Sequence, residues 1–220
     1  MNNDFWHERW ALNEIGFHRK DTNSFLVRYW PTLETKATES IFVPLCGKSL
    51  DLIWLSQRCK HVIGVELSNT AIEDFFSEQQ LEPSIKEHHG LTRYQYGNIT
   101  LFCGDFFQLR SADFMDCSLI YDRASLIALP PLIRQQYADK LEQLFPHPHK
   151  RLLITLDYDQ QLMNGPPFAV TPEEVNQLFV IHHQLRCLES IDIIEDSQRF
   201  KDKGLNSLIE RIYILESSKQ

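Results

Sequence analysis

Residues 40–49 read SIFVPLCGKS, a short apolar run that ends in a glycine turn, a lysine and a serine. An apolar run of this length, followed by a turn and a segment of helical period, predicts a buried strand that leads into a helix. The same alternation recurs along the chain and is typical of an α/β sheet with helices on its faces. No repeats or linker-like stretches interrupt it, so we expect one domain over residues 1–220.

The apolar runs predict where the strands lie. Five runs separated by helical segments are expected to form parallel strands: Ser40–Leu45, His61–Glu66, Ile99–Gly104, Ser118–Asp122 and Arg151–Asp157. Two further runs, around Cys187–Ile194 and Ser207–Leu215, follow each other without a long helix and predict a C-terminal antiparallel hairpin. Together these runs predict a doubly wound, seven-stranded mixed sheet that is mostly parallel.

Helix starts support this division. Ser49, Ser68 or Thr70, Pro131 and the capping box that begins at Thr171 each stand where a helix is expected to begin. Residues 1–40 differ because they are rich in aromatic side chains. We expect them to form helices that cover one end of the sheet, as a lid over a ligand or as simple core packing.

The composition excludes several classes of protein. Lys and Arg total 22 against 30 Asp and Glu, a net charge of −8, whereas affinity for nucleic acid depends on neutralising phosphates. The chain has eight glycines and no G-x-G spacing, so the dinucleotide fingerprint and the Walker A loop are both absent. Nicotinamide-dependent oxidoreductases and P-loop NTPases are therefore excluded, and no nucleic-acid partner is expected.

The cysteines and the hydropathy indicate the compartment. Five cysteines contain no C-x-x-C pair, which favours reduced, mostly buried thiols, with a reactive thiol as the alternative. No apolar run approaches the ~18–20 residues that span a bilayer, and the N-terminus lacks the features of a signal peptide. We expect a soluble, cytoplasmic protein with no membrane partner.

Ligands of doubly wound sheets bind outside the carboxyl ends of the strands, so the residues that follow each strand are the candidates for a site. Gly47 lies in the turn after the first strand, where a ligand can approach the backbone. Glu66 ends the second strand, nineteen residues further on, a spacing at which an acid accepts hydrogen bonds from ribose hydroxyls. The alternative is that Glu66 is a solvated strand end.

The next two strand ends carry an acid and an arginine. Asp105 and Phe106 follow the third strand, where a carboxylate can accept from an adenine amino group and an aromatic ring can pack on the base. Arg123 ends the fourth strand, either facing a ligand or paired with Asp122 or another acid. Acids at two strand ends, without a glycine-rich phosphate loop, favour an adenosine ligand that lacks a pyrophosphate, and S-adenosylmethionine is such a ligand.

Over nearly its whole length the chain resembles the bacterial branch of the thiopurine S-methyltransferase family. The order and spacing of P-L-C-G-K, G-V-E and D-R-A are the most specific part of this resemblance. The matching stretches are Trp6–Trp10, Gly16–His18, Pro44–Ser49, Gly64–Ser68, Gly97–Cys103, Asp122–Ala124, Tyr158–Asp159, Gly165–Phe168 and Arg186–Glu189. The resemblance implies a Rossmann-like class I methyltransferase fold and transfer of a methyl group from S-adenosylmethionine to sulfur.

The resemblance also implies roles for individual residues. The expected cofactor contacts are Trp10, Leu45, Gly47, Glu66, Asp105, Phe106 and Arg123. The expected acceptor contacts are Phe17, Arg123 and Arg199, and the two arginines are expected to orient the acceptor in the reaction. No general base is assigned, because an acidic thiol needs none.

Two other sequence patterns and one other class of protein compete with this interpretation. His88-His89 and His182-His183 suggest metal, but adjacent side chains diverge and no partner stands at ligand spacing, so no metal is expected. Pro166-Pro167-Phe168 resembles the N-P-P-Y element of nucleic-acid methyltransferases, but it follows the fifth strand and begins with glycine. A non-catalytic nucleoside-binding protein is the alternative from another class.

The natural acceptor stays open at the level of sequence. Thiopurines, other aromatic or heterocyclic thiols, and selenium or tellurium oxyanions in a detoxifying role all fit a broad apolar pocket. We expect a small-molecule thiol as the partner, a role in xenobiotic metabolism or in tellurite and selenium detoxification, and a monomeric protein.

Overall fold

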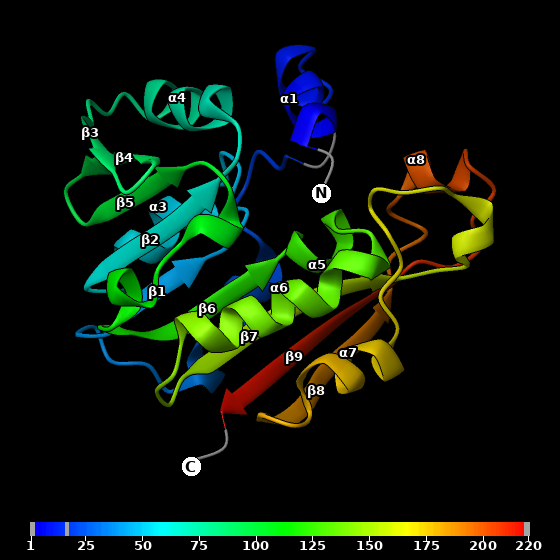
Figure 1. Ribbon diagram of the computed structural model, residues 1–220. Coiled ribbons are helices and arrows are strands. Elements are labelled where there is room, and N and C mark those ends of the chain that lie inside the picture. The colour runs from blue at the N-terminus through cyan, green and yellow to red at the C-terminus, as the bar shows by residue number, and fades with distance from the viewer. Residues whose placement is uncertain (1–2, 16–17, 218–220) are drawn as a thin grey trace. The chain divides into compact units, whose positions relative to one another are not determined.

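The computed structural model describes residues 3–15 and 18–217. Contacts between Cα atoms divide the chain between Tyr121 and Asp122 into an N-terminal and a C-terminal unit. Each unit has its own set of paired strands (Figure 1). The single domain over residues 1–220 stays a prediction.

The N-terminal unit holds six strands in the order β3-β4-β5-β2-β1-β6. Their bounds are β1 Ser40–Val43, β2 His61–Glu66, β3 Ser84–His88, β4 Leu91–Tyr96, β5 Ile99–Cys103 and β6 Cys117–Arg123, the last ending just past the boundary between the units. The pairs β1–β2, β1–β6 and β2–β5 are parallel, whereas β3–β4 and β4–β5 are antiparallel. Parallel pairing aligns the carboxyl ends of β1, β2 and β5 along one edge (Figure 1).

Helices and turns fill the connections of this unit. Their bounds are α1 Asn3–Ala11, α2 Ser24–Tyr29, η1 Trp30–Leu33, α3 Asp51–Ser56, α4 Asn69–Glu78, η2 Phe106–Gln108 and η3 Ser111–Phe114. Ser68 caps α4 as predicted, with its hydroxyl accepting from the N–H of Ala71. The apolar face of α4 is fully buried through Ile72 and Phe75, so the helix is fixed by packing rather than by propensity alone.

The C-terminal unit contains three strands in the order β7-β9-β8, and both of its strand pairs are antiparallel. The strands are β7 Lys150–Asp157, β8 His183–Asp192 and β9 Ile209–Ser217, and the helices are α5 Ser125–Ala128, α6 Pro131–Leu144, η4 Gln160–Leu162, α7 Pro172–Phe179 and α8 Gln198–Lys201. Pro131 opens α6, and Thr171 caps α7 through the N–H of Glu174, as the sequence predicts.

The predicted α/β fold with parallel strands and a C-terminal antiparallel pair is confirmed, but its strand number is wrong. Nine strands are assigned in the described residues, instead of seven. The two additional strands, β3 and β4, form a hairpin whose two-residue turn, His89 and Gly90, has positive φ at both positions. All five side chains of β3 are exposed or half-buried, so the strand has no buried face and gives no alternating apolar signal.

Three further expectations can be compared with the structure. In residues 3–15 and 18–217, no helix is both long and apolar enough to span a bilayer. All five cysteines are free thiols: Cys46, Cys59 and Cys117 are buried, Cys103 is half-buried and Cys187 is exposed. The helical character expected for residues 1–40 is confirmed by α1, α2 and η1, whereas their role as a lid stays a prediction.

Candidate functional site

The turn after β1 brings the backbone of Gly47 to the carboxyl edge of the N-terminal unit. Leu45 and Gly47 both adopt positive φ, +45° and +52°, which folds the chain back sharply before α3. The N–H of Cys46 donates to the carbonyl of Val65 at 2.9 Å, so the turn is fastened to β2. Only glycine adopts the conformation of residue 47 without strain, and its missing side chain leaves the backbone accessible.

Trp10 of α1 packs against this turn. A Cβ atom placed on Gly47 would lie 3.3 Å from Cζ2 of Trp10, and the indole is only 5% exposed. The two residues stand 37 positions apart, so the contact ties the aromatic N-terminal segment to the turn. Trp10 therefore lies beside Gly47, and its expected contact with the cofactor stays a prediction.

Glu66 is the polar centre of the edge. Its Oε2 accepts from the N–H of Gly47 at 2.9 Å, and its Oε1 accepts from the N–H of Ser68 at 2.8 Å. Burial raises the pKa of Glu66, and the hydrogen bonds from Ser68 and Gly47 oppose that rise. A carboxylate oxygen has two lone pairs, so both oxygens retain capacity to accept from a ligand.

Asp105 follows β5 at the same edge. The N–H of Gly104 donates to the carbonyl of Glu66 at 2.9 Å and thereby holds the end of β5 beside the end of β2. Asp105 then caps η2, with Oδ1 accepting from the N–H of Phe107 at 2.9 Å. The half-buried carboxylate is thus held in one orientation by its own turn.

Two aromatic residues, Phe106 and Phe107, follow Asp105. Phe106 is 2% exposed, and its ring stacks on that of Phe42 in the core, with centroids 6.5 Å apart. The ring of Phe107 is half-buried instead and meets Phe106 edge to face at 5.3 Å. The cofactor contact of Phe106 stays a prediction, and the structure adds Phe107 as the less buried ring at this turn.

Lys48 is a residue of the motif to which the sequence assigned no role. Its side chain is 6% exposed, and its ammonium group lies 2.9 Å from Oδ2 of Asp74 and 2.7 Å from Oε1 of Glu78, both on α4. Burial opposes its charge, but the hydrogen bonds that its ammonium group donates to Glu78 and Asp74 outweigh this and raise the pKa of Lys48. Lys48 therefore anchors the residue next to Gly47 to α4.

Arg123 and Arg199 belong to the C-terminal unit. Arg123 is the half-buried last residue of β6, directly before Ala124, whose φ is +66°. The neighbouring carboxylate of Asp122 is fully buried and accepts from the hydroxyl of Tyr137 at 2.8 Å, so Asp122 is engaged by a tyrosine. Burial raises the pKa of Asp122, and the nearby Arg151 acts against that rise.

Arg199 lies on the short helix α8 and is exposed, with its guanidinium 4.9 Å from the centroid of the Phe200 ring. Phe17 lies outside the described residues. The structure thus brings Trp10, Gly47 and Glu66 into contact within the N-terminal unit and places Leu45 and Asp105 on the connections beside them. The acceptor roles of Phe17, Arg123 and Arg199 stay predictions.

This arrangement suits a ligand with hydroxyl groups and positive charge. Two carboxylates, Glu66 and Asp105, follow adjacent strands, and the single-glycine turn offers no cradle for a pyrophosphate. The thiol of Cys46, behind the turn, is buried, and burial together with Glu66 raises its pKa well above the usual value. A thiol held protonated in this way is not a nucleophile.

The comparisons with known proteins give a consistent result. A sequence profile of the family described as Thiopurine S-methyltransferase matches residues 1–218. A protein of Pseudomonas fluorescens named thiopurine S-methyltransferase is 48% identical over 215 residues, which cover 98% of this chain and 97% of that protein. One of the same name from Azotobacter vinelandii is 47% identical over 216 residues, 98% and 99% of the two chains.

Solved structures resemble this chain in fold. A methyltransferase from Anabaena variabilis, described as dependent on SAM, superposes with a TM-score of 0.64 at 15% identity and covers 98% of this chain and 95% of its own. A phosphoethanolamine N-methyltransferase from Haemonchus contortus, solved with S-adenosyl-L-methionine, gives a TM-score of 0.62 at 7% identity over 88% of this chain and 52% of that chain. Identities this low show the fold alone.

Proposed function

The chain belongs to the thiopurine S-methyltransferase family and is a methyltransferase with S-adenosylmethionine as its cofactor. We propose that it transfers the methyl group to the sulfur of a small aromatic or heterocyclic thiol. The observation that carries the proposal is the carboxylate of Glu66, held by the N–H groups of Gly47 and Ser68 at the carboxyl edge of β2. When bound, S-adenosylmethionine supplies an electrophilic methyl group on a sulfonium sulfur.

The residues of the edge fit this cofactor. Glu66 has lone pairs to spare for two ribose hydroxyls, because a carboxylate offers about four acceptor positions and the N–H groups of Gly47 and Ser68 take one on each oxygen. The carboxylate of Asp105 is held in place by its hydrogen bond from the N–H of Phe107 in η2. In the proposal it accepts a hydrogen bond from the amino group of adenine. Negative charge at both strand ends favours a sulfonium cation and disfavours the phosphates of a nucleotide.

The reaction needs little acid–base chemistry from the chain. A thiolate attacks the methyl carbon, the bond from that carbon to the sulfonium sulfur breaks, and two neutral thioethers result. Because charge disappears in this step, residues that exclude water and hold the two sulfurs in line with the carbon accelerate it most. Trp10, packed on Gly47, is placed to exclude water from the cofactor side.

For the acceptor, we propose that Arg123 and Arg199 bind the anionic ring of a thiopurine. A guanidinium pairs with a delocalised anion without giving up its own proton, so Arg123 and Arg199 orient the acceptor rather than act as bases. The family resemblance implies an aromatic acceptor contact at Phe17, which the proposal keeps. A broad apolar pocket of this kind accepts simple aromatic thiols as well as thiopurines.

The test compares acceptors in parallel with the purified full chain. We expect S-methylated product, with one S-adenosylhomocysteine formed per product, from 6-mercaptopurine and from thiophenol. Hypoxanthine and phenol, which place oxygen where these acceptors have sulfur, should give none. Binding of S-adenosylmethionine by calorimetry without transfer to either thiol would leave a nucleoside-binding protein, and transfer confined to selenite or tellurite would replace the thiol as substrate.

A further inference from the structure

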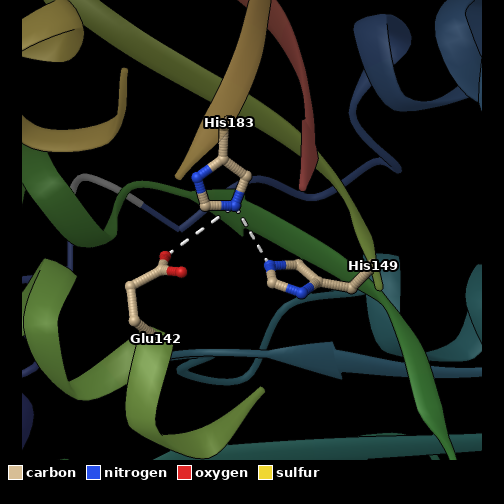
Figure 2. Close-up of side chains that lie close together, drawn as sticks. All are labelled: Glu142, His149 and His183. Carbon is tan, nitrogen blue, oxygen red and sulfur yellow. Dashed lines mark hydrogen bonds and ion pairs between the residues drawn. The ribbon is translucent and has the colours of Figure 1, made fainter. Parts of the chain in front are cut away.

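The C-terminal unit buries two histidines beside a glutamate. His149, directly before β7, and His183, the first residue of β8, both flank Ser217 at the end of β9. Residues in register on neighbouring strands face the same side of a sheet, and the small serine lets the two imidazoles meet across it. Glu142 of α6 comes toward the same point from the helix that lies over this region (Figure 2).

The hydrogen bonds of the two imidazole rings show which nitrogen atom of each carries the hydrogen. Nδ1 of His149 lies 2.9 Å from the carbonyl oxygen of His147, and Nδ1 of His183 lies 3.3 Å from that of Phe179. A carbonyl oxygen only accepts, so each Nδ1 carries the hydrogen and each Nε2 of a neutral ring carries a lone pair. Orientation of this kind, by a backbone carbonyl on the far nitrogen, is what holds histidine ligands of metals in place.

The lone pairs converge on one point. The two Nε2 atoms are 3.2 Å apart, and Nε2 of His183 is 3.7 Å from Oε1 of Glu142 (Figure 2). His149 and His183 are 4% and 2% exposed, and Oε1 of Glu142 is buried without a hydrogen bond from any described residue. Three electron-pair donors that face one another in the interior call for a positive charge between them.

We propose that Glu142, His149 and His183 bind a divalent transition-metal ion of the zinc type, at a site separate from the one for methyl transfer. Their ligand atoms all lie within 4.8 Å of one another. Two nitrogens at ~2.0–2.1 Å from zinc and at a tetrahedral angle stand about 3.3 Å apart, which matches the spacing of the two Nε2 atoms. Two imidazoles and one carboxylate leave a fourth position for water, a ligand set that zinc uses.

Arg151 is the side chain that opposes a cation here. Its Nη2 lies 3.5 Å from Oε1 of Glu142, and its guanidinium stands 4.5 Å from the centroid of the Phe179 ring. The fully buried carboxylate of Asp122 interacts with the same guanidinium. Arg151 is therefore shared between two carboxylates and is not the counter-charge of Glu142 alone.

The position of the cluster separates it from the proposed methyl-transfer site. His149 precedes the first residue of β7, whereas ligands of such sheets bind beyond the carboxyl ends of the strands. The ion would therefore stabilise the junction of α6, β7 and β8 rather than take part in methyl transfer. Sequence spacing did not indicate it, because His149 stands 34 residues before His183 and the two meet only through the register of β9.

The experiment uses the full chain, freed of metal with a chelator and titrated with Co²⁺ and then with Zn²⁺. We expect one equivalent of Co²⁺ to give the visible absorption of a tetrahedral site, Zn²⁺ to displace it, and either ion to raise the melting temperature. Glu142→Gln and His149→Gln should each lower the affinity for Zn²⁺ by about a hundredfold or more. His182→Gln, a change to the exposed neighbour of His183, is the matched control and should bind as the wild type does.

Two results would overturn the proposal. One is a folded, metal-free wild type that takes up no stoichiometric Co²⁺ or Zn²⁺, which would mean that one ring donates to the other as a plain hydrogen bond. The other is uptake that is equal in the wild type, Glu142→Gln and His149→Gln, which would move the ion elsewhere. Circular dichroism of each metal-free variant shows whether it is folded, and Glu142→Gln, nearly the same shape as the native side chain, is the variant on which the decision rests.

Discussion

Oε2 of Glu66 accepts a hydrogen bond from the backbone N–H of Gly47 at 2.9 Å, across nineteen residues of sequence. The bond joins the end of β2 to the turn after β1, so the carboxylate fixes the turn at the carboxyl edge of the strands. The same carboxylate also accepts from Ser68 at 2.8 Å, at the start of α4. The spacing between glycine and acid that the sequence offers as a binding signal is therefore also a structural link.

Replacing Glu66 should weaken cofactor binding. Glu66→Ala removes the charged acceptor for the ribose hydroxyls, and hydrogen bonds to charged groups contribute ~1.5–3 kcal/mol, so affinity for S-adenosylmethionine should fall about ten- to hundredfold. Calorimetry measures the affinity, and thermal melts show whether the variant is folded. Glu82→Gln, a change to an exposed acid, is the control. Unchanged binding in a folded Glu66→Ala protein would remove Glu66 from the site.

Gly47 and Gly97 form a matched pair of tests. Their φ angles are +52° and +53°, so alanine at either position costs about 1–2 kcal/mol of backbone strain. A Cβ at Gly47 would also press on Trp10 at 3.3 Å, whereas one at Gly97 meets nothing within 4 Å. Both variants should melt at lower temperature, but only Gly47→Ala should bind S-adenosylmethionine more weakly. Equal cofactor affinity in the two variants would show that the turn does not touch the ligand.

Lys48 should contribute to stability far more than an ordinary surface lysine. Lys48→Met breaks two short ion pairs of a side chain that is 6% exposed, and because Asp74 and Glu78 are partly solvated the loss should be about 1–2 kcal/mol. Lys60→Met is the control, since Lys60 is 60% exposed and lies 3.8 Å from Asp116, and it should change stability by less than ~0.5 kcal/mol. Urea unfolding measures both, and equal losses would contradict the anchoring role of Lys48.

How far the sequence predicts this protein depends on burial. β1, β2 and β5 are buried runs next to glycine turns, and each is recognisable from its apolar residues alone. β3 and β4 form a hairpin with little buried surface, so neither apolar runs nor alternation reveal it. Hydrophobic patterning reports burial, and elements that bury little are the ones it misses.

The candidate site shows the same limit. Glu66 is predictable because a strand end and a glycine spacing coincide, whereas the choice between Phe106 and Phe107 depends on which ring the short helix η2 turns inward. The cluster of Glu142, His149 and His183 depends on strand register, which the spacing of the three residues does not contain. Contacts that depend on strand register therefore cannot be predicted by inspecting a single sequence.

The stability of the ligand-free protein should depend on the ionisation of Glu66. Burial raises the pKa of Glu66 above the usual 4.5, so the folded state binds this proton more tightly than the unfolded state does. Stability from this group is therefore gained as the pH falls from 7 toward 4.5 and lost as the pH rises. The glutamine of Glu66→Gln cannot titrate. As the pH falls from 7 toward 4.5, the free energy of unfolding of the wild type should therefore increase relative to that of this variant. Urea unfolding at several pH values measures it, and a decreasing difference would contradict the assignment.

The last prediction separates the two arginines. Arg123 is half-buried at the end of β6, and the adjacent Asp122 is already engaged by Tyr137 at 2.8 Å, which argues against a simple pair between neighbours. If Arg123 holds the acceptor against the cofactor, Arg123→Ala should lower kcat/KM for every thiol about tenfold or more, the value of one charge-assisted contact. Arg199 is exposed on α8, so Arg199→Ala should raise KM for anionic thiopurines and leave cofactor affinity intact.

Steady-state kinetics with a thiopurine and with thiophenol, whose ring has no ionisable nitrogen, distinguish the two roles, and thermal melts monitor folding. Arg123→Lys keeps the charge without the planar fork and should recover part of the activity if pairing with the acceptor is the role of Arg123. An Arg123→Ala enzyme that melts earlier but turns over normally would assign this arginine to the scaffold. Wild-type constants for a thiopurine in Arg199→Ala would exclude Arg199 from the acceptor pocket, because a lost ionic contact to the anionic ring must appear in KM.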